Sequence, residues 1–412
     1  MADRRRVVIT GLGMASAIGV TEADFWANLM AGRSGIDRLT ALDTTDYRVD
    51  IGAEADAAAV KAGLQRLGRR AIDRALDLAM IAGSDALQQA GLVSEPPYEP
   101  QDVAVIFGTG VGSAQSHHTA FTAFAKKGPR GLRPTTVPRC MYNAISSGLS
   151  IHFRLTGANY MVVSACTSST NAIGAAFRQV RDGYAETVLC GGAEGFFDPF
   201  FYGVWNNLGV LSTHAEPKKA CRPFDADRDG CVLGEGAAAL VVESLDRARA
   251  RGARIRGEIV GYGETSDAAH RTQPSADGQA QAMRRALEDA RVDPAELGAV
   301  NAHGTATRAN DLTESQSIRQ VLGKAVDDVS VVANKSYFGH TLGASGALET
   351  IVALLGLEAG VLPPNLNLER PDPECQVMLV GSEPRQVDSP LVMKNSFGFG
   401  GGNGVLVLRR AD

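Results

Sequence analysis

The sequence has few cysteines for its length, and their spacing excludes two common classes of cysteine-rich protein. Six cysteines are dispersed over 412 residues, and no two of them form a Cys-X-X-Cys pair. This pattern argues against a zinc ribbon and against a small disulfide scaffold. We therefore expect free thiols in a reducing compartment, the cytoplasm. The six are Cys140, Cys166, Cys190, Cys221, Cys231 and Cys375.

The chain also lacks an excess of positive charge and a long apolar run. Its formal net charge is -5 at pH 7, which argues against a general nucleic-acid binder. We see no apolar run of the length needed to span a bilayer, so no membrane segment is expected. Three arginines at residues 4–6, followed by apolar residues, resemble the start of a signal peptide. However, Gly11 and Gly13 interrupt the run, which we interpret as a buried strand leading into a glycine loop.

What the chain does have is length and glycine. Its 412 residues are too many for one ordinary core, so we expect two large halves, residues 1–250 and 251–412. The 46 glycines cluster in short loops, which indicates backbone held close to ligands or to other backbone.

After about residue 250 the pattern of the first half begins again. Ile259-Val-Gly-Tyr-Gly repeats Ile9-Thr-Gly-Leu-Gly. Each half then alternates short buried strands with amphipathic helices, such as those expected at residues 69–90 and 348–355. Residues 126–139, rich in proline, glycine and basic side chains, are expected to form a loop. The pattern predicts a duplicated α/β fold with buried sheets.

An apolar run in the first half, Val-Val-Ser-Ala-Cys, ends at Cys166. One face of a following helix is marked by the spacing of Ile173, Ala176, Phe177 and Val180. Cys166 is therefore expected where a strand meets a helix N-terminus. Unpaired N–H groups and the helix dipole there predict a lowered thiol pKa. This stretch alone supports either a nucleophile or a buried structural cysteine.

Two other kinds of site are suggested only weakly. The glycine loops that begin at Gly11 and Gly108 resemble dinucleotide fingerprints, but neither is followed by a convincing ribose-binding acid. Residues 225–230 begin like a calcium loop, yet Gly236 stands where that loop needs a glutamate. We therefore expect no metal and no nucleotide.

Three motifs in the second half carry chemistry. His303 directly follows a buried strand in Val-Asn-Ala-His-Gly-Thr-Ala-Thr. Lys335 and His340 share the loop Asn-Lys-Ser-Tyr-Phe-Gly-His. Phe397 and Phe399 lie in the glycine loop Asn-Ser-Phe-Gly-Phe-Gly-Gly-Gly. Each has an ordinary structural explanation on its own, but together with the cysteine they form a specific combination.

With Cys166, these motifs resemble those of the β-ketoacyl-ACP synthase family, in particular its synthase II-like elongating branch, over essentially the whole chain. The resemblance implies the duplicated thiolase-like fold, five αβαβα layers with two mixed sheets. It also implies a decarboxylative Claisen condensation without a resident cofactor. An acyl chain arrives on the phosphopantetheine arm of an acyl carrier protein, becomes a thioester of Cys166, and is lengthened by malonyl-carrier protein.

The resemblance also gives the catalytic residues their roles. Cys166 is the nucleophile, and its backbone N–H forms an oxyanion hole with that of Phe399. Neutral His303 and His340 donate to the enolate oxygen. Lys335 remains cationic.

The support expected for these groups comes from three acids. By resemblance, Glu349 is the buried counter-ion of Lys335, which would be costly to bury unpaired. Asp311 and Glu314 resemble the structural acids of the family.

The substrate-binding residues are implied in the same way. Thr305 and Thr307 resemble hydroxyls that bind the pantetheine arm, while Phe397 and Phe399 resemble a gate. The acyl tunnel is expected to be lined by Val111, Thr136, Trp205, Cys231 and Phe397. Thr136 and Cys231 stand where large aromatic side chains are usual in the family, which predicts a differently shaped tunnel.

An acidic carrier protein needs a basic docking face. The expected docking residues are Arg69, Arg70, Lys126, Lys127, Arg130 and Arg133. The second partner is a further copy of the chain or a chain-length-factor-like subunit.

The predicted function is therefore a β-ketoacyl-ACP synthase of a dissociated fatty acid, polyketide or polyene pathway. A second hypothesis is a ketosynthase subunit that works as a heterodimer with a chain-length factor in specialised polyketide biosynthesis. A non-catalytic partner subunit is a third hypothesis, and Cys166 with both histidines argues against it. The fourth is an unrelated Cys–His hydrolase, which would release free acid.

Overall fold

The computed structural model describes residues 4–94 and 96–411. Its main sheet has eleven strands in the order β12-β10-β9-β14-β15-β8-β1-β7-β6-β4-β5. The first half provides β1 (Val7–Ser16), β4 (Ala104–Gly108), β5 (Asn159–Val162), β6 (Thr187–Glu194) and β7 (Gly236–Ser244). The second half provides β8 (Gly257–Ser266), β9 (Ala299–Asn301), β10 (Ser330–Val332), β12 (Met378–Leu379), β14 (Leu391–Gly398) and β15 (Gly402–Arg409).

The two halves repeat one strand order. In the first, β5, β4 and β6 are parallel and continue through antiparallel β7 and β1; in the second, β10, β9 and β14 are parallel and continue through antiparallel β15 and β8. This is the duplicated α/β fold expected from the sequence. The two expected mixed sheets are joined, because β1 and β8 pair over three residues on each strand, starting at Val7 and Ile259.

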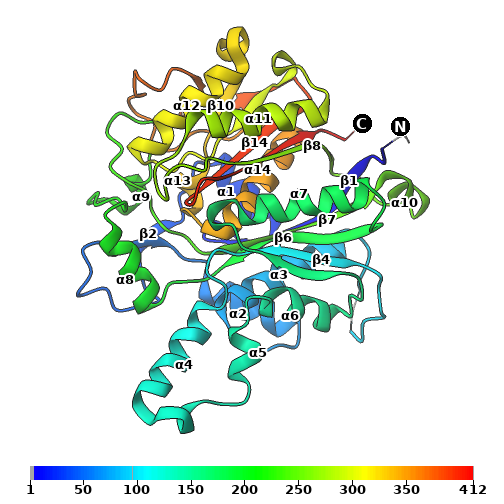
Figure 1. Cartoon of the computed structure of the whole chain (residues 1–412), viewed down its shortest axis with the longest axis vertical. Helices are drawn as coiled ribbons and strands as arrows, with labels where there is room; N and C mark the ends of the chain where they lie inside the picture. The colour runs from blue at the N-terminus through cyan, green and yellow to red at the C-terminus, as the bar shows by residue number, and fades with distance from the viewer. Residues whose placement is uncertain (1–3, 95, 412) are drawn as a thin grey trace.

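Helices cover and separate the two half-sheets, giving five layers (Figure 1). One outer layer has α2 (Ala57–Arg66), α3 (Arg74–Gln89) and α6 (Ala144–Phe153). The central layer has α7 (Ser168–Arg181) and α14 (Ser345–Ala359), and the other outer layer has α11 (Ala276–Ala290) and α12 (Arg308–Leu322).

Shorter elements surround these layers. Alongside α1 (Glu22–Met30), the structure has α4 (Ala114–Lys127), α5 (Thr136–Cys140), α8 (Pro199–Leu208), α9 (Pro217–Ala220), α10 (Leu245–Ala250) and α13 (Lys335–Phe338). Two small hairpin-like sheets pair β2 (Ile36–Arg38) with β3 (Ile51–Ala53) and β11 (Val361–Leu362) with β13 (Arg385–Gln386). The 3₁₀ helices are η1 (Gly128–Gly131), η2 (Ala165–Thr167), η3 (Pro294–Glu296), η4 (Gly323–Asp327) and η5 (Leu342–Ala344).

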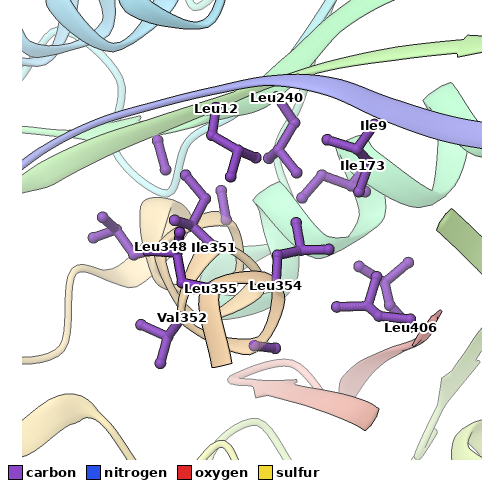
Figure 2. Close-up of a cluster of buried hydrophobic side chains, with 14 of the residues drawn as sticks. Ile9, Leu12, Ile173, Leu240, Leu348, Ile351, Val352, Leu354, Leu355 and Leu406 are labelled. Atoms are coloured by element: carbon purple, nitrogen blue, oxygen red, sulfur yellow. The ribbon is translucent and has the colours of Figure 1, made fainter. Parts of the chain in front are cut away.

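The core is organised around α14, which lies between the half-sheets. Its apolar side chains pack against residues of β1, α7, β7 and β15 (Figure 2). The segment Leu342–Ala359 is long and apolar enough to cross a membrane by composition, contrary to the sequence-based expectation, but 89% of it is buried. Because both faces meet protein, we interpret α14 as a core helix.

Three local predictions were wrong. The supposed glycine loop after residue 10 is strand, since β1 runs to Ser16. A Cβ at Gly11 would lie 2.0 Å from the carbonyl oxygen of Ala86, so the missing side chain lets α3 pack directly on the strand. The helix expected from residue 69 begins at Arg74, capped by Asp73. The loop expected at residues 126–139 contains the end of α4, η1 and most of α5.

The helix-start motif of Cys166 is repeated in the second half. Each central helix follows a short 3₁₀ turn that opens with a residue of positive φ, Ala165 at 54° and Leu342 at 42°. The next residue is Cys166 in the first half and Gly343 in the second. The duplication therefore provides two equivalent turns, only one of which carries a thiol.

Candidate active site

Cys166 lies in η2, between β5 and the N-terminus of α7, as the sequence predicted. The turn is fixed by Ser168, whose hydroxyl accepts a hydrogen bond from the Ser164 N–H at 2.9 Å and donates to the Ala165 carbonyl at 2.6 Å. The cysteine is 6% exposed. Its thiol is therefore held in one place at the inner end of a cavity.

The structure brings both histidines of the second half to this thiol. Nε2 of His340 lies 3.1 Å from Sγ of Cys166, and Nδ1 of His340 lies 3.0 Å from the Ser345 hydroxyl. The His303 and His340 rings are perpendicular, with centroids 5.3 Å apart. Segments 137 residues apart or more in the sequence thus meet around one sulfur.

Lys335 determines the tautomer of His303. Its ammonium lies 3.2 Å from Nδ1 and also donates to the backbone carbonyl of His303. Because an ammonium has only donors, Nδ1 of His303 must accept, and the ring proton is on Nε2. Glu349, fully buried, is ion-paired with Lys335. Nε2 of His303 is therefore available as a hydrogen-bond donor.

Two buried acids fix the loop that carries His303. Glu314 accepts from the N–H groups of His303 at 2.7 Å and Gly304 at 2.9 Å. Asp311 accepts from the Thr305 N–H at 3.0 Å. Burial raises the pKa of both carboxyls, while these backbone donors oppose the shift. Their position fits the structural role expected for them.

Both imidazoles are held neutral. Burial is the largest cause that lowers the pKa of His303 and of His340 well below the ordinary value, and the nearby Lys335 cation lowers both further. A neutral imidazole with a proton on Nε2 is a hydrogen-bond donor at physiological pH. His303, whose ring proton is on Nε2, can therefore stabilise a developing oxyanion, and His340 can do so in its Nε2–H tautomer.

The predicted low pKa of the Cys166 thiol is wrong. Burial raises it to about 11, and the opposing effects of Lys335 and of the N–H groups of Phe399 and Cys166 are smaller. A helix N-terminus does not offset the loss of hydration at a buried site. The thiol must pass its proton to a neighbour as it reacts, and Nε2 of His340 is in reach.

A cavity of about 280 Å³ leads to these three groups. Of the predicted substrate-binding residues, Thr305, Thr307, Trp205, Cys231 and Phe397 line it. The hydroxyls of Thr305 and Thr307 lie 2.9 Å apart. Small, polar and aromatic residues therefore surround a channel that the Cys166 thiol and both imidazoles help to line.

The glycine loop closes one side of the channel. Phe399 is 39% exposed and stacks on Trp205, with ring centroids 5.9 Å apart. A Cβ on Gly398 would lie 3.2 Å from the backbone nitrogen of Cys166, so a side chain there would displace the loop or Cys166 by a few tenths of an ångström. The position of Phe399 suits both a gate and an oxyanion-hole donor.

Two expected tunnel residues do not line this cavity. Val111 is half-buried, packs against the cluster that includes Cys166, and donates its N–H to Glu194 at 3.1 Å. Thr136 lies at the start of α5, where its hydroxyl accepts from the Arg133 N–H at 3.3 Å. Their roles in substrate binding remain predictions.

The six expected docking residues are on the surface near the first outer layer. Arg69 and Arg70 lie in the connection before α3, and Lys126 and Lys127 end α4. Arg130 and Arg133 follow in and after η1. Nη1 of Arg69 lies 3.3 Å from Nδ1 of His152. All except Arg69, which is half-buried, are exposed.

The sulfur and the two imidazoles are also residue types that bind metals. Their ligand atoms lie within 4.8 Å of one another. The 3.1 Å separation of Sγ and Nε2 is a hydrogen-bond distance, and burial keeps the thiol protonated. A zinc ligand set would need a thiolate, so this arrangement fits proton transfer better.

Sequence reasoning missed two buried charged groups. Glu194, at the end of β6, accepts from the N–H groups of Gly110 at 2.6 Å and Gly343 at 3.0 Å, and burial raises its pKa to about 7. Lys394, in β14, lies beside Glu349. The available signal was a charged residue in, or at the end of, a buried strand, and it does not by itself identify the partners.

The chain is similar to known proteins in sequence and in structure. The Beta-ketoacyl synthase N-terminal domain matches residues 4–248 and the corresponding C-terminal domain matches residues 256–369. The chain is 38% identical over 411 residues to a 3-oxoacyl-[acyl-carrier-protein] synthase 2 of Synechocystis sp., covering 99% of both chains. A protein of the same name from Coxiella burnetii is 39% identical over 414 residues, again covering 99% of both.

Three solved structures that match the chain are also of ketosynthases. The ishigamide ketosynthase/chain length factor matches with a TM-score of 0.92 at 34% identity, covering 100% of both chains. A beta-ketoacyl synthase from Burkholderia phymatum matches with a TM-score of 0.90 at 36% identity, covering 99% of this chain and 100% of that one. A type II PKS ketosynthase in complex with its acyl-carrier protein matches with a TM-score of 0.89 at 26% identity, with 99% and 100% covered.

Proposed function

The chain belongs to the β-ketoacyl synthase family, and on that premise we propose that it is an elongating β-ketoacyl-acyl carrier protein synthase. It is an acyltransferase that forms a carbon–carbon bond by decarboxylative Claisen condensation. The observation that carries the proposal is the convergence of one thiol and two neutral imidazoles at the inner end of a single channel.

The first half-reaction loads the enzyme. The Cys166 sulfur attacks the thioester carbonyl of the acyl-carrier protein, and its proton passes through Nε2 of His340 to the departing pantetheine sulfur. The N–H groups of Cys166 and Phe399 both act on the sulfur of Cys166. The carbonyl carbon bonded to that sulfur carries its oxyanion within the same region, so these donors stabilise it.

The second half-reaction forms the new bond. Malonyl-carrier protein loses carbon dioxide, and the electron pair of the broken bond becomes an enolate. Nε2–H of His303, fixed by Lys335, donates to the enolate oxygen. His340 donates with it in the tautomer that has its proton on Nε2, in which Nδ1 accepts from the Ser345 hydroxyl. The enolate carbon attacks the Cys166 thioester, and the cysteine leaves as a thiolate that is then reprotonated. The product is a 3-ketoacyl chain two carbons longer.

Carrier-protein substrates explain why no resident cofactor is proposed. The phosphopantetheine arm is part of the substrate. We propose that Thr305 and Thr307, which line the channel with hydroxyls 2.9 Å apart, bind it. The basic residues before α3 and at the end of α4 are proposed to dock the acidic carrier protein. We assign the enzyme to the cytoplasm, where its six free cysteines stay reduced.

A second subunit is proposed at the edge of the first half-sheet. Strand β5 is the last strand of the sheet there, and unpaired edge strands are usually covered. Exposed apolar side chains gather on the neighbouring segments: Phe121, Phe124, Val137, Met141, Tyr142, Ile151 and Val163. A surface of this kind marks a protein–protein interface. The partner is another copy of the chain or a chain-length-factor-like subunit.

Two pathways remain as candidates. The curated relatives are 3-oxoacyl-[acyl-carrier-protein] synthases, which supports fatty acid synthesis. The match to a ketosynthase/chain length factor at a TM-score of 0.92 supports a heterodimeric ketosynthase of polyketide or polyene synthesis. Co-purification with a neighbouring subunit and product analysis with defined acyl chains separate them.

Mass spectrometry after incubation with acyl-carrier protein tests the reaction. We expect an acyl adduct on Cys166 and, after malonyl-carrier protein is added, a 3-ketoacyl product. Cys166→Ala should form neither, while Cys140→Ala, which removes a partly exposed thiol on α5, should form both. A non-catalytic subunit would give no adduct, and a hydrolase would release free acid and ignore malonyl-carrier protein. Either result overturns the proposal.

A further inference from the structure

A second buried lysine lies beside the catalytic network. Lys394 is in β14, three residues before Phe397, and its side chain is 0% exposed. A lysine in such a place needs a partner, because burying an unpaired ammonium is costly. The condensation chemistry described above does not use it.

The partner of Lys394 is the carboxylate that already holds Lys335. The Lys335 ammonium contacts Oε1 of Glu349, and the Lys394 ammonium lies 3.1 Å from Oε2. One carboxylate therefore stands between two ammonium groups. With all three groups ionised, the cluster has a net charge of +1 inside the protein.

Lys394 also joins the two segments that carry the chemistry. It donates to the hydroxyl of Thr170 at 3.0 Å and to that of Ser396. Thr170 is on α7, four residues and about one turn after Cys166. Ser396 directly precedes Phe397 in β14. The Lys394 ammonium thus contacts α7, which follows Cys166, the strand β14, which leads to Phe397, and the Lys335–Glu349 ion pair.

On the basis of the proposed condensation, we infer that Lys394 is a positioning residue of the active site. It is ion-paired with the second oxygen of Glu349 and adds a second buried positive charge, which keeps His303 and His340 neutral while anionic intermediates form. It acts through other groups and does not touch the substrate.

The electrostatics of the neighbouring groups agree with this role. The positive charge of Lys394 lowers the pKa of both histidines, in addition to burial and to Lys335. Glu349 on α14 and Glu314 on α12 are the acids that act on Lys394, and Lys335 on α13 is the cation.

The charge on Lys394 depends on pH. Burial, partly offset by Glu349, lowers its pKa to about 8. Below that pH the cluster carries its extra positive charge, and above it the extra charge is lost. We therefore expect the wild-type rate to fall on the alkaline side near pH 8.

The test replaces Lys394 by methionine, which has a similar shape without the charge, and measures the pH dependence of condensation. At pH 7 we expect kcat to fall about 10-fold with KM within about 2-fold of the wild type, because the lysine acts on the transition state and not on substrate binding. The alkaline limb near pH 8 should disappear. The acid limb should move to higher pH, because the histidines lose one of the charges that lower their pKa.

A second readout does not depend on the reaction. The chain has only seven histidines, so in protein with ¹³C-labelled histidine the resonances of His303 and His340 can be followed individually. Their pKa should rise in Lys394→Met. Lys394→Gln provides the same test with a polar side chain if the methionine variant folds poorly. Lys61→Met, which removes an exposed lysine on α2, is the matched control and should behave like the wild type.

The outcomes separate two possible failures. If the wild type does not condense substrates, the proposed function fails. If the wild type condenses them, but both Lys394 variants keep its pH profile and its histidine pKa values and lose rate equally at every pH, Lys394 is only structural and the inference is wrong.

Discussion

Replacing Glu349 by glutamine should destabilise the fold strongly, because one carboxylate serves two buried lysines. Lys335 contacts one of its oxygens, and Lys394 lies 3.1 Å from the other. All three side chains are 0% exposed. The substitution keeps the size of the side chain and removes only the negative charge.

The magnitude follows from two estimates. Removing one partner of a buried ion pair costs about 3–5 kcal/mol, because the other charge is left uncompensated. With an unfolding entropy of roughly 2 cal/mol/K per residue, a chain of 412 residues loses roughly 4–6 °C in Tm for that change. Even with Glu349 present, lowering the pKa of Lys394 from 10.5 to about 8 costs the native state about 3 kcal/mol.

The loss of folding stability in Glu349→Gln, relative to the wild type, should depend on pH. The pKa of Lys394 is lower in the folded than in the unfolded state, so its penalty is full below about pH 8 and is relieved as the pH rises towards 10.5. In Glu349→Gln the carboxylate no longer raises that pKa, so Lys394 loses its proton at a lower pH. The part of the deficit due to Lys394 is therefore largest in acid and disappears near pH 8.

Thermal unfolding of the wild type and of Glu349→Gln at pH 6 and pH 8.5 measures this pH dependence of the stability difference. We expect a larger difference in Tm at pH 6. The matched control is Glu358→Gln, on the same helix but partly exposed and paired with Arg256, which keeps Glu22 as a second partner. That change should cost less than Glu349→Gln, because the Arg256 charge keeps one carboxylate partner. A Tm for Glu349→Gln within about 1 °C of the wild type at pH 6, or a deficit independent of pH, would refute the reasoning.

Two further predictions concern the channel and its surface. Gly398→Ala places a methyl group 3.2 Å from the nitrogen of Cys166 and should lower kcat by about 10-fold to 100-fold by displacing an oxyanion-hole donor, as measured by condensation at saturating substrate. Gly381→Ala, where nothing lies within 4 Å of the added carbon, is the control, and equal losses in both would contradict the close-approach argument. Charge reversal at Arg69 and Arg130 should raise KM for carrier-bound substrate about 5-fold and leave a free pantetheine thioester unaffected, whereas equal effects on both substrates would remove the docking proposal.

Much of the fold was readable in the sequence because its signals are local. The periodicity of residues 173–180 predicted α7, and the repeated Ile-X-Gly-X-Gly pattern indicated the duplication that the strand order displays. The glycines of β1 were misread. They appeared to mark a loop, but their reason is the approach of α3, a contact between segments about 70 residues apart.

The residues of the candidate site also differ in whether local sequence signals or only contacts between distant segments reveal them. Residue types and local motifs singled out Cys166, His303, Lys335 and His340, and the structure places all four together. Glu194 and Lys394 were overlooked, since a charged residue in a buried strand has no meaning until its partners are known. Val111 and Thr136, chosen by resemblance, do not line the cavity in this chain.

The sequence by itself determined which groups are available for chemistry and which elements carry them. Only the tertiary structure decided their protonation, because pKa values depend on burial and on neighbouring charges that come from distant segments. The thiol shows this most clearly. Its place at a helix start suggested a ready thiolate, whereas the packing of the two halves around it keeps the proton on sulfur and brings Nε2 of His340 to 3.1 Å from it.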